Sequence, residues 1–179
     1  MERVAKILLV LVICVVAMAH QTAAEESKGK DLINKVCSRS STTDMCNEVL
    51  SSDSISPNAN LKDLAIIALR VAANNASSIL NDVKTMIDDA ELDPDIQQGL
   101  ADCKETILDA ESQLEDTIAA LLVDADVDAQ LWLKAALAAI QTCDDSIPGK
   151  DDVLSVKSAT FRKLCNIAVA LSLSLPNQN

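Results

Sequence analysis

Among the residue types in this chain, cysteine offers the most chemistry. The six cysteines are at positions 14, 37, 46, 103, 143 and 165. In an oxidising compartment, thiols such as these pair as disulfides. Cys103 and Cys143 have their midpoint at residue 123, where an apolar helical stripe meets Asp124 and Asp126. If the chain reverses there between antiparallel helices, one disulfide would fix the register of the two helices. Two bridges among the five cysteines after residue 24 allow fifteen connectivities, so the spacing leaves the pairing open.

The sequence offers little for catalysis or metal binding. The single histidine, His20, lies beside a predicted cleavage site. The mature protein is therefore not expected to form a histidine–nucleophile pair or a usual zinc site. Asp124, Asp126 and Asp128 have the alternate spacing of the first ligands of a calcium loop. Alanine stands at both other diagnostic positions, Ala129 in place of the glycine and Ala135 in place of the bidentate glutamate. We therefore predict no enzyme activity, no metal site and no cofactor.

Three further residues carry their own chemistry. Cys165 has apolar neighbours, which favours a free thiol that is buried and unreactive. Asn75 begins an Asn-Ala-Ser sequon, a glycosylation acceptor in a secreted protein, although its neighbour Ala76 lies on a predicted buried stripe. Trp132 is the only tryptophan and is either a partner-binding anchor or a residue half-buried at a helix seam.

The first 24 residues have the pattern of a secretory signal peptide. Arg3 and Lys6 precede an apolar run, and small residues then offer cleavage after Ala19 or Ala24. That run, of about 13 residues, is too short to span a bilayer. The mature protein is therefore expected to be extracellular and free of the membrane. The net charge of the whole chain, -12, also disfavours nucleic acid as a partner.

The apolar residues after the leader recur at helical spacing, and no alternating strand pattern is present. Residues 28–52 indicate two short helices around a polar loop at 38–44. Four longer stripes follow: Leu61 to Ala90; Ile96 to Leu121; Val127, Leu131, Ala135, Ala138 and Thr142; and Val153 to Leu171. Four amphipathic helices with short links bury their stripes best as an antiparallel up-and-down bundle. The predicted fold is all-α.

Several segments carry a family resemblance in their order and spacing. They are the two cysteine pairs, Leu100 to Glu105, Trp132 to Leu137 leading to Thr142-Cys143-Asp144-Asp145, and Leu164 to Ala168. On these residues the chain resembles the plant pectin methylesterase inhibitor and invertase inhibitor family over about residues 30–175. The resemblance implies Cys37–Cys46 and Cys103–Cys143 bridges and a four-helix bundle with an N-terminal helical hairpin. It makes residues 25–179 one inhibitor-like domain, and it implies an apoplastic protein that occludes the active-site cleft of a cell-wall enzyme.

The residues at the turn favour one target over the other. Invertase inhibitors of the family carry a Pro-Lys-Phe motif, and the matching positions here are Asp126, Val127 and Asp128. The basic and aromatic groups are therefore missing, which favours pectin methylesterase as the partner. Invertase (beta-fructofuranosidase, of the cell wall or vacuole) is the alternative. A non-inhibitory helical binding protein, with an apolar ligand in the bundle core, is a more distant one. The sequence assigns no partner-contact residues.

Overall fold

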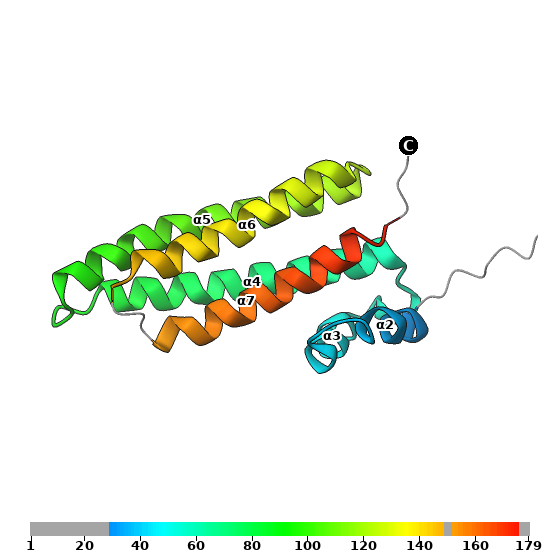
Figure 1. Ribbon diagram of the computed structural model, residues 1–179, viewed down its shortest axis with the longest axis horizontal. Helices are drawn as coiled ribbons and strands as arrows, with labels where there is room; N and C mark the ends of the chain where they lie inside the picture. The colour runs from blue at the N-terminus through cyan, green and yellow to red at the C-terminus, as the bar shows by residue number, and fades with distance from the viewer. Residues whose placement is uncertain (1–28, 149–151, 176–179) are drawn as a thin grey trace, which may run out of the picture.

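The computed structural model describes residues 29–148 and 152–175, and every regular element in these ranges is helical (Figure 1). The predicted signal peptide and His20 lie outside the described residues. The elements are α2 (Gly29–Cys37), α3 (Thr43–Leu50), the 3-10 helix η1 (Ser56–Asn58), α4 (Leu61–Ile87), α5 (Pro94–Leu122), α6 (Asp126–Ser146) and α7 (Asp152–Ser172). The all-α prediction is confirmed.

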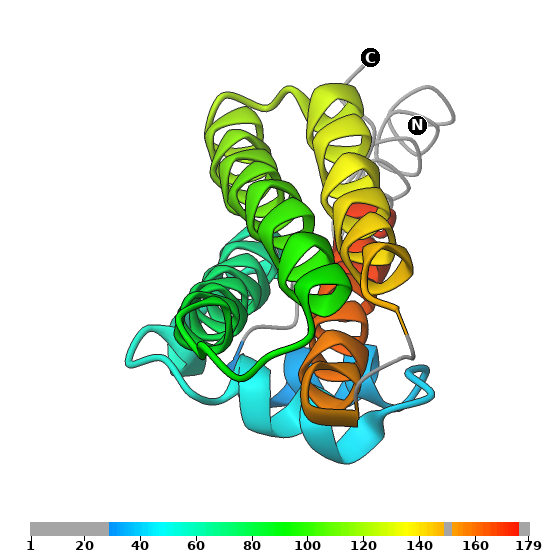
Figure 2. The ribbon, with the colours of Figure 1, turned by 90° about the vertical axis from the view of Figure 1, so that its left-hand side faces the viewer.

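Helices α4 to α7 form the predicted antiparallel up-and-down bundle. Each of them packs against the next in the chain, and α7 closes the ring against α4 (Figure 2). The hairpin of α2 and α3 lies beside this bundle, near the start of α4 and the last part of α7 (Figures 1 and 2). Of the helices in the described ranges, none combines the length and the hydropathy needed to cross a bilayer.

Local sequence signals define where the bundle helices begin and end. Asn60 caps α4 in a capping box, in which its side chain accepts a hydrogen bond from the Asp63 amide and the Asp63 carboxylate accepts one from the Asn60 amide. Asp93 caps α5, and Pro94 occupies the first helical position, where its missing N–H costs nothing. The predicted reversal after Leu122 is confirmed, because α5 ends there and α6 begins four residues later.

The predicted stripes are correct on α5 and on α4 up to Met86, and wrong on α6; Ala90, the last residue of the α4 stripe, is exposed and lies beyond the end of the helix. Residues such as Ala72 and Ile107 are fully buried, as their stripes predict. On α6 the prediction buried Val127 and Leu131, but both are exposed. The residues of α6 that face the core are Ala129, Leu133, Ala136, Ile140 and Cys143. The predicted stripe was therefore out of phase by about two residues. On α7 the stripe is right in its second half, whereas Val156 is exposed.

Candidate partner-binding surface

The part of the chain that the structure describes contains no candidate metal site. No set of three or more histidine, cysteine, aspartate or glutamate residues in those ranges is arranged to hold a metal ion. Asp124, the first residue of the calcium-like triplet, instead forms an ion pair with Lys62 at 2.5 Å. Burial raises the pKa of the Cys165 thiol to about 12. A thiol that stays protonated is a poor nucleophile, so Cys165 has a packing role.

The other four cysteines in the described ranges are joined in two bridges. Cys37–Cys46 ties α2 to α3. Cys103–Cys143 ties α5 to α6, with 40 residues between them in sequence. These are the two pairs that the family resemblance implies. All four are shielded from solvent, so the bridges are structural parts of the core.

Two other predicted residues lie on helices of the bundle. Trp132 is half-buried and packs against the core from α6, in agreement with the seam interpretation. Asn75 lies in the middle of α4, and its side-chain oxygen is buried without a hydrogen-bond partner in the described structure. Ser77, the third residue of the sequon, donates a hydrogen bond to Glu111 on α5. Glycosylation of Asn75 stays a prediction.

An exposed apolar cluster lies where α5 turns into α6. Leu122, Val123, Val127 and Leu131 are each between 61% and 81% exposed, and we call this set the α5–α6 tip. Val127 and Leu131 are four residues apart and so share one face of α6. A solvent-exposed patch of large apolar side chains often indicates a surface that binds another protein.

The tip combines apolar contact area with negative charge. Asp124, Asp126 and Asp128 alternate with its apolar residues along the chain, and Asp128 is exposed. Asp124 has a left-handed backbone conformation, with φ at 59°. Its bond to Lys62 fixes this turn to the first turn of α4. Leu122 and Val123 thus flank a turn that is tied to α4, whereas Val127 and Leu131 are held by helix α6 itself.

Sequence reasoning missed the tip because it placed Val127 and Leu131 on the buried stripe. A signal that gives the correct phase was nevertheless present. If Cys143 forms the bridge that fixes the register of the two helices, it faces the core, and steps of three and four back from it lead to Ile140, Ala136, Leu133 and Ala129. That series leaves Val127 and Leu131 on the opposite side of the helix.

Comparison with known proteins gives one consistent answer. Residues 31–171 match the family model described as plant invertase/pectin methylesterase inhibitor. Pectinesterase inhibitor 3 of Arabidopsis thaliana is 26% identical over 157 residues, which cover 81% of this chain and 77% of that protein. The pectinesterase inhibitor of Actinidia deliciosa is 24% identical over 172 residues, covering 94% of this chain and 91% of that protein. A Platanus acerifolia protein, provisionally named as an invertase inhibitor, is 28% identical over 123 residues, covering 68% of each chain.

A solved structure supports the fold. The crystal structure of a mutant form of a pectin methylesterase inhibitor from Arabidopsis superposes with a TM-score of 0.69. The superposition covers 82% of this chain and 98% of that one at 24% sequence identity. This agreement supports the arrangement of helices on which the tip is presented.

Proposed function

Because the chain belongs to the plant invertase/pectin methylesterase inhibitor family, whose members inhibit enzymes and are not enzymes themselves, we propose that its target is pectin methylesterase. Two observations support this target over invertase. The relatives named as pectinesterase inhibitors align over more of the chain than the two Platanus relatives named for invertase. The tip also carries Asp126, Val127 and Asp128, where invertase inhibitors are expected to have Pro-Lys-Phe.

We propose that the α5–α6 tip is the contact surface and that inhibition is steric. The observation that carries this proposal is the exposure of four apolar residues at the α5–α6 turn and on the first turns of α6, namely Leu122, Val123, Val127 and Leu131. Four apolar side chains with neighbouring carboxylates suit an apolar hollow with a basic rim on the enzyme. Charge complementarity of this kind increases the association rate and selects the partner, whereas the apolar contacts slow dissociation. Secretion to the apoplast belongs to the same proposal.

A pair of matched variants tests the contact surface. Val127→Asp places a charge in the tip, and Val156→Asp makes the same change on α7, where Val156 is 69% exposed. Val156 is near the start of α7, at the end of the bundle opposite to the tip. We expect Val127→Asp to weaken inhibition of purified pectin methylesterase at least about tenfold, which corresponds to about 1.4 kcal/mol. Val156→Asp is expected to leave it unchanged.

The same titration tests the choice of target. The wild-type protein is titrated against purified pectin methylesterase and cell-wall invertase at acidic pH. We expect stoichiometric loss of esterase activity and no effect on invertase. Inhibition of invertase alone would establish the alternative target. For the contact surface, an equal loss of inhibition in Val127→Asp and Val156→Asp would refute the tip.

A further inference from the structure

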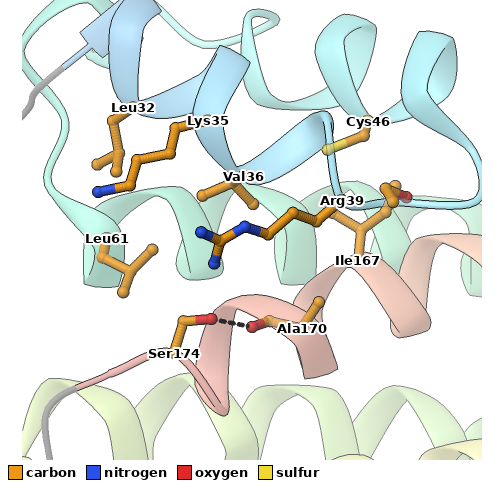
Figure 3. A pocket seen from close by; sticks show the side chains of 10 residues that line it. Leu32, Lys35, Val36, Arg39, Cys46, Leu61, Ile167, Ala170 and Ser174 are labelled. Carbon is orange, nitrogen blue, oxygen red and sulfur yellow. Dashed lines mark hydrogen bonds between the residues drawn. The ribbon is translucent and has the colours of Figure 1, made fainter.

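A groove between the N-terminal hairpin and the bundle forms a second candidate site, at the same end of the bundle as the tip but lined by none of its four residues. It has a volume of about 300 Å³ and is lined by residues of α2, α4 and α7 (Figure 3). Its apolar walls include Leu32 and Val36 from α2, Leu61 from α4, and Ile167 and Ala170 from α7. Pockets for small ligands run from about 300 to 1,000 Å³, so this groove suits a small, slender molecule.

The charge of the groove is opposite to that of the protein. The chain has 27 acidic and 15 basic residues, yet the described lining contains Lys35 and Arg39 and no carboxylate. The two cations are four residues apart in the sequence. Lys35 lies in the last turn of α2, and Arg39 lies two residues past the end of that helix. No described carboxylate forms an ion pair with either one. The groove therefore combines an apolar floor with two positive charges that have no protein counter-ion in the described ranges.

Arg39 is not needed to satisfy the neighbouring end of α7. Figure 3 shows its guanidinium among the lining residues, between Val36 on α2 and Ser174 at the end of α7. The last carbonyls of α7 already accept hydrogen bonds from within that turn. The Ser174 hydroxyl donates to the Ala170 carbonyl at 2.7 Å, and the Ser172 hydroxyl donates to the Ala168 carbonyl at 2.9 Å. The guanidinium donors are thus available to a ligand.

We propose that this groove binds a single-chain amphiphile with an anionic head, such as a medium-chain fatty acid. The alkyl chain would lie against Val36, Leu61 and Ile167, where its methylenes are removed from water. The carboxylate would accept hydrogen bonds from Lys35 and Arg39 at the mouth. Because the walls come from both the hairpin and the bundle, such a ligand also ties the two together.

Three probe molecules separate the contributions of head and tail. Decanoate is titrated by calorimetry into the oxidised full-length protein, well below its micelle concentration. Acetate supplies the head without the tail, and decyltrimethylammonium supplies the tail with the opposite charge. We expect saturable 1:1 binding of decanoate and at least tenfold weaker binding of the other two. Equal binding of decanoate and decyltrimethylammonium would overturn the proposal.

Matched variants locate the site. Lys35→Glu with Arg39→Glu is expected to weaken decanoate binding at least tenfold. Lys84→Glu with Lys163→Glu makes the same charge change at exposed lysines outside the groove and is expected to stay within twofold of wild type.

A third variant fills the groove without changing its charge. Ala170→Trp is expected to abolish binding, and because Ala170 is on the exposed side of α7 this variant keeps the core intact. Circular dichroism shows whether the variant with Lys35→Glu and Arg39→Glu still folds. If that variant does not fold, Ala170→Trp tests the location of the site. Unchanged binding in Ala170→Trp would overturn the proposal. Loss of a wild-type dimer in the same variant, measured by sedimentation, would also overturn it, because it would assign the groove to a second copy of the chain.

Discussion

Removing each disulfide in turn tests whether the bridges stabilise the fold through loop closure. One variant carries Cys103→Ala and Cys143→Ala, and the other carries Cys37→Ala and Cys46→Ala. The bridges close loops with sequence separations of 40 and 9 residues. The loop-entropy relation gives about 3.9 kcal/mol for the long loop and about 2.6 kcal/mol for the short one. All four cysteines are equally buried, so the effects of truncating their side chains are similar. The expected difference is about 1.3 kcal/mol in favour of the long bridge.

Urea unfolding of the wild type and both variants measures this difference. Circular dichroism reports on all helices, whereas the fluorescence of Trp132 reports on the bundle. Coincident transitions by the two probes establish that the hairpin and bundle unfold together. The free energies of unfolding are then compared, provided that their dependence on urea concentration has the same slope in all three proteins. An equal loss in the two variants, or a larger loss without the short bridge, would refute the loop-closure reasoning.

Three other residues give further tests. Cys165 is expected to resist a thiol reagent at pH 8 in the folded protein and to react fully in guanidinium chloride, since burial raises its pKa to about 12. Between the ordinary thiol pKa of 9.0 and about 12, only the unfolded state loses this proton. Stability is therefore expected to fall with rising pH across that window, and less so in Cys165→Ala. Gly99→Ala is expected to destabilise the protein by about 2 kcal/mol, because the new Cβ would lie 2.3 Å from the Ser146 carbonyl oxygen. Replacing an ordinary glycine inside a helix with alanine stabilises the protein. A higher urea midpoint for Gly99→Ala would therefore contradict this close contact. A glycan on Asn75 is expected to lower the urea midpoint, because it attaches to the nitrogen of the same side-chain amide whose oxygen is buried. Peptide mapping identifies the glycosylated fraction, and an unchanged midpoint in that fraction would contradict the expectation.

The sequence predicted the helices better than it predicted their exposed surfaces. The stripe on α5 is regular because Leu100, Cys103 and Ile107 are all apolar and face one seam. On α6, apolar residues occupy both sides of the helix, since Leu131 and Leu133 are equally hydrophobic but only Leu133 is buried. Periodicity alone does not choose between two apolar faces.

The groove was beyond sequence reasoning for a different reason. Arg39 and Ile167 are 128 positions apart, and they meet only because the hairpin folds back along α7. No local pattern records that packing. The sequence suggested an apolar ligand only in the bundle core, whereas the described cavity lies between the core bundle and the N-terminal hairpin.

The two disulfides follow one another along the chain, which has a consequence for synthesis. If the chain is secreted, as we propose, it emerges into an oxidising compartment. Cys46 then emerges when Cys37 is the only other thiol after residue 24 that has been synthesised. Cys103 then waits for Cys143, about 2 to 8 seconds later at ordinary synthesis rates of about 5–20 residues per second. Cys165 arrives last, after each earlier thiol has had its partner. The order of the cysteines thus guides native pairing among fifteen alternatives, and the odd thiol is buried by the closing helix α7.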